Sequence, residues 1–434
     1  MTATIAKPFA SIESGKAAET LRKVPSSSKV AYLVSRFPKL TETFVLYEVL
    51  AVEETGQHIE LYPLQRERTK TMHPEAAEVV RRARFTPWIS WSCLLAHGWF
   101  LTRRPKAYFR ALGRLLWANL GSARYFAGAV CFFPKAVLIA RQLELSGVGH
   151  IHAHFASHPA AVAFVIHRLT GIPYSFTAHG SDLHRDRHML REKVAEAKFV
   201  VAVSEYNRRL IAGECGAHAA DRIRVLHCGV DTRVFKPREA SHRPAAGTFE
   251  ILCVGALHEV KGQTYLLEAC RTLRERGLPV VCHLVGDGPD RRALERQAEA
   301  AGIAPFVRFH GRLKRQDVAD LLARVDVAVT PSVPTADGRR EGIPVALMEA
   351  LACGLPTVAS DLSGIPELIE HERSGLLVAP RDASGLAAAL ERLRVDPALA
   401  LRLGSAGRRR VVEAFDLRMN AQALAALFPR GERA

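Results

Sequence analysis

The feature that most constrains the fold is an alternation of short β-branched runs with helical patterns, which occurs twice along the 434 residues. The first series of β-branched runs covers residues 29–34, 58–63, 150–155, 174–177, 199–203 and 223–226. The second series covers residues 250–254, 280–285, 307–309, 325–330, 356–359 and 376–378. Strands that alternate with helices form parallel sheets with right-handed crossovers. The sequence therefore predicts an α/β protein with two doubly wound, Rossmann-like domains.

A polar, Pro-containing stretch at residues 238–247 separates the two series and is typical of a linker. It divides the chain into a domain of residues 29–237 and a domain of residues 248–415. Residues 1–28 lack the apolar core of a signal peptide and are expected to form a flexible leader. Residues 416–434 are expected to form a helix that packs back on the first domain. Ligands of doubly wound sheets bind at the carboxyl ends of the strands, so we expect a site in a central cleft between the domains.

Residues 79–143 form a basic and aromatic segment that contains no Asp or Glu. All four Trp residues of the chain lie in it, and the chain as a whole carries a formal charge of +16. Trp and Phe with flanking Arg favour an interfacial helix on an anionic membrane surface. Two alternatives are helices that pack on the first sheet with a solvated Arg face, and a surface that stacks single-stranded nucleic acid. No nucleic-acid motif accompanies the segment, so we expect no nucleic-acid partner.

The pattern of Cys and His residues indicates the redox compartment of the protein and whether it binds a metal ion. None of the eight Cys residues forms a C-x-x-C pair, and several lie in apolar runs, which predicts buried thiols in a reducing compartment. The chain has neither an H-E-x-x-H motif nor an evident Asp-x-Asp motif, so we predict no metal and no cofactor. No run of about 20 uncharged apolar residues exists. We therefore expect a cytoplasmic protein that is peripheral on the inner face of the cytoplasmic membrane.

The most informative chemical signal begins at Glu341 and ends at Glu349. Gly342 permits a tight turn after the preceding strand and loop, and Pro344 suits the first turn of a helix. The N-terminus of such a helix offers free amides and a partial positive charge, which is a natural site for a diphosphate. The two carboxylates are acceptors for vicinal hydroxyls, so one can hold a sugar and the other a ribose.

This segment resembles the E-x7-E signature of retaining glycosyltransferases of the GT-B fold, glycosyltransferase family 4. Further matches lie at residues 227–231, 254–262, 286–289, 309–311, 350–360, 364–369 and 374–378. The stretch at residues 35–45 resembles the subgroup that builds exopolysaccharides of the colanic acid type. The resemblance implies an enzyme that moves a hexose from a nucleoside-diphosphate sugar to a hydroxyl of a lipid-linked saccharide acceptor, with retention of configuration.

The resemblance also implies a donor site in the second domain. Lys261 is expected to contact the diphosphate, Glu349 the ribose and Glu341 the sugar. Further donor-binding residues are Gly255, Gly342, Arg312 and the backbone of Ile343, Pro344 and Val345. The family usually has an Arg after the glycine at 255, where this chain has Ala256. Arg36, Lys39 and Arg312 are the candidates to replace that cation.

The acceptor half of the site is expected in the first domain. Arg36 and Lys39 follow the first strand, and Thr41 can cap the next helix; the two cations could equally be surface charges of the loop. His154, His179 and Asp182 lie at or just after strand ends, where a cleft would form. The resemblance makes His179 a catalytic residue together with Glu341 and Lys261, although an isolated His is often structural.

Two other functions fit the same sequence. A sugar-nucleotide epimerase of the same fold would convert the donor without an acceptor. An inactive membrane-surface scaffold would bind the donor without turnover, and Ala256 lends that alternative some weight. Assays of sugar nucleotides with and without an acceptor distinguish these functions.

Overall fold

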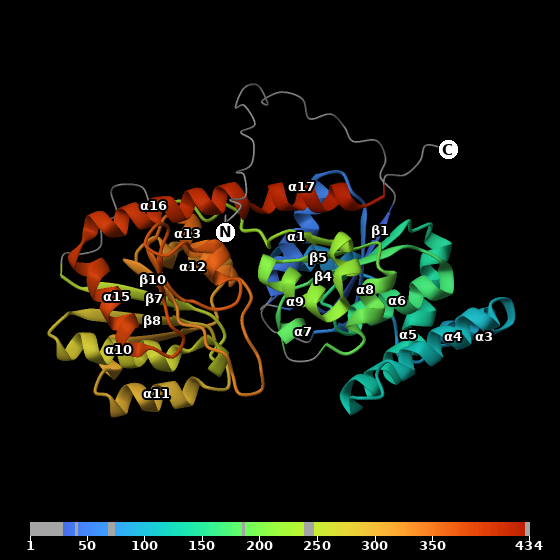
Figure 1. Ribbon diagram of the computed structural model, residues 1–434, viewed down its shortest axis with the longest axis horizontal. Coiled ribbons are helices and arrows are strands. Elements are labelled where there is room, and N and C mark those ends of the chain that lie inside the picture. The colour runs from blue at the N-terminus through green and yellow to red at the C-terminus, as the bar shows by residue number, and fades with distance from the viewer. Residues whose placement is uncertain (1–28, 40–41, 68–73, 185–186, 238–246, 430–434) are drawn as a thin grey trace, which may run out of the picture.

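The computed structural model describes residues 29–39, 42–67, 74–184, 187–237 and 247–429. These residues form two α/β domains that lie side by side (Figure 1). The N-terminal domain is built on a six-stranded parallel sheet with the strand order β2-β1-β3-β4-β5-β6. Its strands are β1 (Val30–Phe37), β2 (Ile59–Arg66), β3 (His150–His154), β4 (Tyr174–Ala178), β5 (Phe199–Ala202) and β6 (Ile223–Val225).

The C-terminal domain contains a second six-stranded parallel sheet, in the order β12-β11-β10-β7-β8-β9. Its strands are β7 (Phe249–Val254), β8 (Val280–Val285), β9 (Val307–Gly311), β10 (Val327–Thr330), β11 (Thr357–Ser360) and β12 (Leu376–Val378). The twelve strands coincide with the twelve predicted runs, and their ends are shifted by a few residues at most. The predicted fold class of two doubly wound parallel-sheet domains is therefore confirmed.

Helices cover both faces of each sheet, because the crossovers are right-handed and the strand order runs in both directions from the middle of the sheet. The N-terminal domain contains α1 (Thr43–Glu54), α2 (Pro74–Arg82), α3 (Trp91–Arg103), α4 (Pro105–Trp117), α5 (Ala123–Ser146), α6 (His158–Thr170), α7 (Ser181–His184), α8 (Leu190–Glu196) and α9 (Glu205–Cys215). The C-terminal part contains α10 (Gln263–Glu275), α11 (Arg291–Ala300), α12 (Arg315–Leu322), α13 (Val345–Ala352), α14 (Ile365–Leu368), α15 (Ala383–Val395), α16 (Pro397–Ala414) and α17 (Leu417–Leu427).

Strand β1 shows how the sheet of the N-terminal domain is buried on both faces. Val30 and Tyr32 belong to the core beneath α1 and α17. Ala31 and Leu33 belong to the opposite core, beneath α3 to α6. Because successive side chains of a strand point to opposite faces, only a near-continuous apolar run satisfies both cores.

The last two helices connect the domains. Helix α16 lies along the C-terminal domain, and α17 continues over the N-terminal domain (Figure 1). Leu417, Ala421 and Leu424 of α17 are buried in the core of the N-terminal domain. Two backbone hydrogen bonds, Val230 N to Phe415 O at 2.9 Å and Leu417 N to Val230 O at 3.0 Å, join this crossing to the other interdomain segment. The domains are therefore held together where the chain passes between them twice.

The basic and aromatic segment folds into α3, α4, most of α5 and the end of α2. By length and composition α5 is long and apolar enough to cross a membrane, and half of its most apolar window is buried inside the protein. Its packing against α3 and α6 is that of a core helix. The eight Cys residues are free thiols, but Cys131 is exposed and Cys228 is partly exposed, so the expectation of uniformly buried thiols was wrong for these two.

Candidate active site in the interdomain cleft

A cleft with a volume of about 1150 Å³ lies between the two domains, at the carboxyl ends of the strands. The N-terminal domain contributes segments that follow β1, β3 and β4, and the C-terminal domain contributes segments that follow β7, β8, β9 and β10. The predicted site residues that line it are Arg36, Lys39, His179, Asp182, Gly255, Lys261, Arg312, Glu341, Gly342, Ile343, Pro344, Val345 and Glu349. Thr41 lies outside the described residues, and the helix that it was expected to cap has Glu42 at its N-cap position.

Lys261 and Glu341 form an ion pair in the wall of the cleft. The ammonium of Lys261 contacts Oε1 of Glu341, and the hydroxyl of Ser332 donates to the other carboxylate oxygen, Oε2. Gly255 lies under the stem of Lys261, where a Cβ atom would be 3.2 Å from the Cδ and Cε atoms of the lysine. The absence of a side chain at 255 therefore leaves room for the lysine to reach the cleft.

The N-terminus of α13 opens into the same wall. Pro344 is the N-cap residue, with φ −66° and ψ 129°, and the helix begins at Val345. The backbone N–H groups of Ile343, Val345 and Ala346 have no partner among the described residues, and all three residues line the cleft. Pro344 has no N–H, so its predicted place among the donor-binding amides was wrong, and it contributes only its fixed φ. This N-terminus can accept an anionic group.

Glu349 lies just over one turn into α13 and is partly exposed to the cleft. Burial raises its pKa from 4.5 to about 7, and the nearby Arg315 guanidinium opposes this increase. Arg315 is the first residue of α12 and was missed by the sequence analysis. The sequence showed only a cluster of cations at 312–315, and nothing in it indicated which of them would reach the cleft.

The three candidates to replace the cation missing at Ala256 all line the cleft but differ in their contacts. Arg36 donates through Nε to Gln65 at 2.8 Å, and Lys39 pairs with Glu42 at 2.5 Å. Arg312 is exposed and has no hydrogen bond or ion pair with any described residue. Arg312 is thus the candidate whose charge is not paired with any residue that the structure describes.

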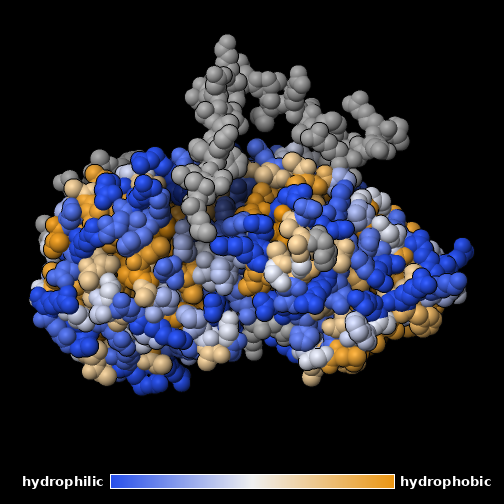
Figure 2. All heavy atoms as spheres, viewed as in Figure 1, coloured by the Kyte–Doolittle hydropathy of each residue, from blue (hydrophilic) through white to orange (hydrophobic). Residues whose placement is uncertain are grey.

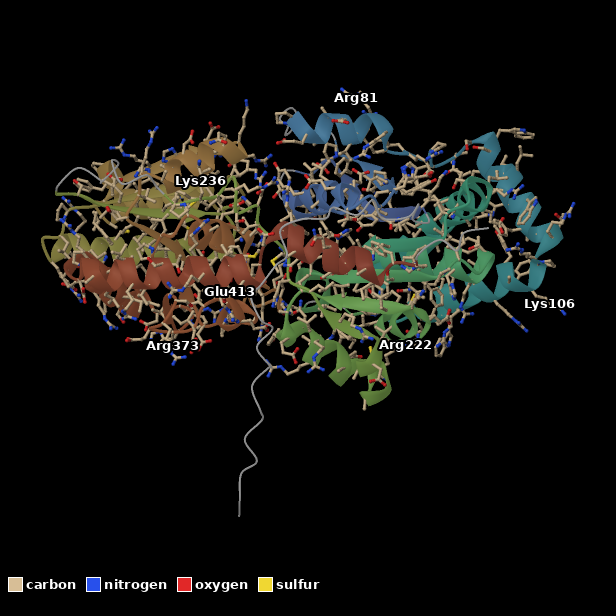
Figure 3. The ribbon with its side chains drawn as sticks, turned by 90° about the horizontal axis from the view of Figure 1, so that it is seen from above. Arg81, Lys106, Arg222, Lys236, Arg373 and Glu413 are labelled. Carbon is tan, nitrogen blue, oxygen red and sulfur yellow. The ribbon has the colours of Figure 1, made fainter. Side chains whose placement is uncertain are left out.

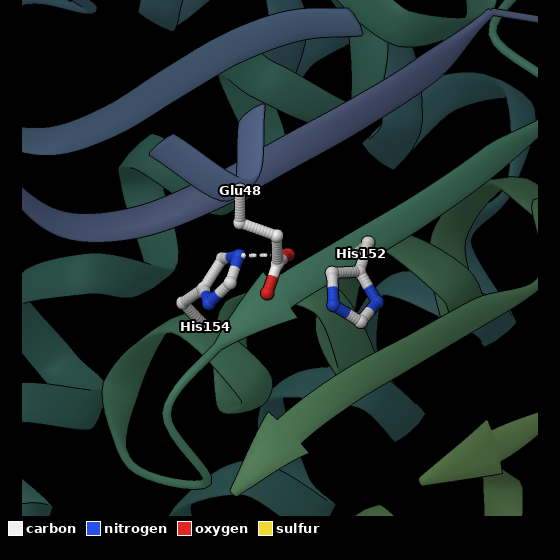
Figure 4. Close-up of side chains that lie close together, drawn as sticks. All are labelled: Glu48, His152 and His154. Atoms are coloured by element: carbon white, nitrogen blue, oxygen red, sulfur yellow. Dashed lines mark ion pairs between the residues drawn. The ribbon is translucent and has the colours of Figure 1, made fainter. Parts of the chain in front are cut away.

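His154 does not line the cleft, and its predicted acceptor role was wrong for a geometric reason. It is fully buried on β3, where Nε2 lies 3.2 Å from Oε1 of Glu48 (Figure 4). Its Nδ1 atom lies 3.0 Å from Nε2 of His179. His154 therefore connects a carboxylate on α1 to the histidine in the cleft wall.

His179 reaches the cleft, but both of its ring nitrogens have partners inside the protein. Nε2 faces His154, and Nδ1 lies 3.7 Å from the sulfur of Cys228. Burial and the neighbouring His154 hold the pKa of His179 well below its usual range, so the ring is neutral. The backbone oxygen of His179 approaches Gly342, where a Cβ atom would be only 2.9 Å away. In this conformation the ring and the backbone of His179 border the cleft, but neither ring nitrogen is free to bond to a ligand.

Asp182 lines the cleft, but its carboxylate is used by the backbone. It accepts hydrogen bonds from the N–H groups of Ala156 at 2.5 Å, His179 at 3.0 Å and Gly180 at 2.8 Å. Burial raises the pKa of Asp182, and these backbone donors oppose the increase. The carboxylate of Asp182 therefore holds together the turns after β3 and β4, and its contact with an acceptor stays a prediction.

Glu48, His152 and His154 are a group whose potential metal-ligand atoms lie within 4.8 Å of one another (Figure 4). The two ring nitrogens of His152 are hydrogen-bonded to Ser175 Oγ at 2.8 Å and to Thr177 Oγ1 at 2.9 Å. These bonds make His152 part of a buried polar network between β3 and β4 and occupy both of its ring nitrogens.

Comparison with known proteins matches both halves of the chain to protein families. Residues 248–396 match the model described as glycosyl transferases group 1, and residues 118–234 match the model of glycosyltransferase family 4. A protein of Escherichia coli K12 named as the colanic acid biosynthesis glycosyltransferase WcaL is 32% identical over 371 residues, which are 83% of this chain and 89% of that protein. The amylovoran biosynthesis glycosyltransferase AmsK of Erwinia amylovora is 36% identical over 262 residues, 58% of this chain and 62% of that protein.

Solved structures share the fold at low identity. A glycosyltransferase from Rickettsia africae has a TM-score of 0.68 at 17% identity and covers 92% of this chain and 98% of its own. Anabaena HepE, solved in complex with UDP and glucose, has a TM-score of 0.67 at 19% identity with the same coverage of both chains. The two family models and the relatives named as glycosyltransferases support a transferase enzyme, and the solved structures show the shared fold.

Proposed function

This chain belongs to glycosyltransferase family 4, and from that premise we propose that it transfers a hexose from a nucleoside-diphosphate sugar to a saccharide acceptor. The observation that carries the proposal is the convergence of Lys261, the free amides at the start of α13 and Glu349 in one wall of the cleft. The complex of HepE with UDP and glucose supports a donor of this class. The names of the E. coli and Erwinia relatives support a role in exopolysaccharide synthesis.

The donor is bound by groups of complementary charge. The diphosphate contacts Lys261, the amides of Ile343 and Val345, and Arg312 in place of the cation missing at Ala256. Lys261 has three N–H donors, so it can contact a phosphate oxygen while it keeps Glu341 in place. Glu341 accepts from the hydroxyls of the hexose, and Glu349 in its ionised form accepts from the ribose hydroxyls.

Transfer breaks the bond between the anomeric carbon and the phosphate oxygen and forms a bond from that carbon to the acceptor oxygen. Negative charge that develops on the leaving diphosphate is stabilised by Lys261 and the α13 amides, which are already in position before the reaction. The acceptor proton passes to the departing phosphate oxygen on the same face of the sugar, which gives retention of configuration. His179 is neutral and borders the cleft, so we propose that its ring positions the hexose.

The acceptor is proposed to be lipid-linked, because the N-terminal domain has an apolar exposed face. On α3, Trp91, Leu94, Leu95 and Leu101 are exposed at spacings that place them along one side of the helix. Figure 2 shows apolar side chains at the lower edge of the N-terminal domain. In the same view, Figure 1 places α3 to α5 at this edge. Monomeric proteins rarely expose a contiguous patch of this kind unless it binds a partner or a membrane.

Unpaired cations border this face. Arg103, at the end of α3, and Lys106 and Arg110, in α4, are exposed and have no ion-pair partner among the described residues. Seen from above, Lys106 lies at the outer end of the N-terminal domain, away from the other domain (Figure 3). Cations beside exposed Trp and Leu side chains suit the surface of an anionic bilayer. We therefore propose a peripheral association with the cytoplasmic membrane through α3 and α4.

Donor binding tests the proposal. A thermal-shift screen with UDP- and GDP-hexoses should raise the melting temperature of the native protein. Lys261→Met should weaken binding of the stabilising donor by about 10- to 150-fold, the cost of one charge-assisted contact. Lys314→Met, which removes an exposed lysine of the same domain outside the cleft, is the matched control. Equal donor affinity in both variants would contradict the proposed diphosphate site.

A further inference from the structure

The cleft continues beyond the predicted acceptor residues, into a region that the sequence analysis did not assign. There it is bordered by side chains from the first three turns of α5 and from the start of α6: Arg124, Tyr125, Phe132, Ser157 and His158. Two of these five are aromatic, one is a histidine, and the other two carry a guanidinium and a hydroxyl. Such a mixture of aromatic surface with a few polar groups is typical of a ligand site.

The aromatic rings of this region form a continuous strip. The ring centroid of His158 lies 5.1 Å from that of Tyr125 and 5.2 Å from that of Phe132. Phe132 in turn lies 5.3 Å from Trp88. The Nζ atom of the buried Lys135 lies 4.1 Å from the centroid of the Trp88 ring, which helps to hold that ring in place.

Gly128 allows this arrangement. It lies between Tyr125 and Phe132 on α5, and a Cβ atom at this position would be only 2.3 Å from the His158 ring. Any other residue would push the imidazole away from the helix, so the helix surface at Gly128 is shaped to receive it. The position of His158 in the strip is therefore fixed by the close packing of the start of α6 against α5.

The outer end of the strip joins the exposed apolar face of the N-terminal domain. Trp88 is 44% exposed, and the neighbouring Ile89 and Trp91 are 89% and 74% exposed. Tyr125, Phe132 and His158 themselves line the cleft, whose lining also includes Phe155 and His179. The strip thus connects the surface proposed to contact lipid with the place where the transfer reaction would occur.

We propose that the strip of Tyr125, Phe132 and His158 is the binding site for the saccharide part of a lipid-linked acceptor. Sugar rings carry apolar C–H faces that pack on aromatic rings, and their hydroxyls can bond to Arg124 and Ser157. The lipid would rest against the exposed residues beside Trp88, and the terminal sugar would reach the cleft. This inference depends on the proposed transferase function and adds the route and the chemical class of the acceptor.

The test measures binding of alkyl glycosides, which join a sugar to an apolar chain. Octyl and methyl glycosides of glucose, galactose, mannose and fucose are titrated below their micellar concentrations into the full-length protein, with calorimetry as the readout. The octyl form of at least one sugar should bind more tightly than its methyl form. Phe132→Ala should weaken its binding about tenfold, which corresponds to the loss of one aromatic contact. Phe132→Trp, which keeps an aromatic ring, should restore most of the affinity.

Phe126→Ala is the matched control, because it removes the same side chain from the same helix at a position outside the cleft. Donor-induced thermal shifts should be the same in all three variants, which shows that each is folded. Equal glycoside affinity in Phe126→Ala and Phe132→Ala would overturn the inference, as would the absence of binding by every glycoside. If glycoside binding depends on Phe132 but the protein transfers no sugar, the proposed function is contradicted and the saccharide site is still supported.

Discussion

The guanidinium of Arg315, in the C-terminal domain, lies 4.0 Å from the centroid of the Tyr47 ring in the N-terminal domain. It also lies 5.3 Å from the ring of Phe235 and 3.9 Å from the carboxylate of Asp231, both in the segment between the domains. Arg315 is mostly buried and lines the cleft near Glu349, whose pKa it lowers. One side chain therefore touches both domains and influences the carboxylate proposed to bind ribose.

Replacing Arg315 should weaken donor binding in a pH-dependent way. In Arg315→Met the pKa of Glu349 rises above its native value of about 7, because the opposing positive charge is lost. More of the group is then protonated at pH 7, and fewer acceptor lone pairs remain for the ribose. We expect the donor dissociation constant at pH 7 to increase, by up to about tenfold for each unit of pKa change, and to recover at pH 9.

Calorimetric titrations at pH 6, 7, 8 and 9 measure this effect. The native protein should bind the donor more tightly as the pH rises through 7, whereas Glu349→Gln should show no such dependence. If Arg315→Met follows the native pH profile, Arg315 does not act through Glu349.

The donor-free protein should be stabilised by Glu349→Gln at alkaline pH. The folded-state pKa of about 7 is above the usual value of 4.5, so the folded state holds this proton more tightly than the unfolded state. The resulting stability is fully present below about pH 4.5 and is lost as the pH rises through 7. At pH 8 the ionised, partly buried carboxylate then costs on the order of 2 kcal/mol.

Thermal denaturation at pH 8 and pH 5 checks this expectation. The melting temperature of Glu349→Gln should exceed that of the native protein at pH 8 and match it closely at pH 5. A gain of equal size at both values would show that the effect does not come from the charge. The expected trade of stability for donor binding is common at functional sites.

Replacing Asp182 should affect folding more than acceptor affinity. Asp182→Ala removes the acceptor of three backbone hydrogen bonds and should destabilise the protein by about 3 kcal/mol or more. Asp182→Asn keeps one oxygen acceptor and should therefore lose less stability than Asp182→Ala. Chemical denaturation measures the loss, and specific activity corrected for the folded fraction should stay near the native value in Asp182→Asn. Unchanged stability with weakened acceptor binding would instead support the predicted contact of Asp182 with the acceptor.

Membrane association should depend on the unpaired cations of α3 and α4. Reversing Arg103, Lys106 and Arg110 to Glu should release the protein from vesicles that contain anionic lipid, because each cation contributes about 1 kcal/mol. The control reverses Arg292, Arg296 and Arg308, three exposed residues of the C-terminal domain. Both triple variants lower the formal charge from +16 to +10. Equal co-sedimentation of the two variants would refute a specific role for α3 and α4.

Lys261, Glu341 and Glu349 were predicted as donor-site residues from the resemblance to glycosyltransferase family 4, and local rules explain why they lie in one wall of the cleft. Glu341 follows β10, Lys261 follows β7, and α13 begins after a loop and a proline. The carboxyl ends of parallel strands meet at one edge of a sheet, so residues that follow different strands converge there. Apolar periodicity had already marked the strands, because a strand buried on both faces must be apolar throughout.

The partners of each side chain were decided only by the tertiary structure. His154 looks like a cleft residue in the sequence, yet it lies behind the wall, and Asp182 lines the cleft with its carboxylate already bonded to backbone N–H groups. Arg315 looks like any other cation near α12, yet it reaches Tyr47 more than 250 residues away in the chain. The sequence itself determined the strands, the two domains and the loops that meet at the cleft, since these follow from patterns within short segments. Which groups remain free for a ligand depends on contacts between distant segments, and those exist only once both domains are packed together.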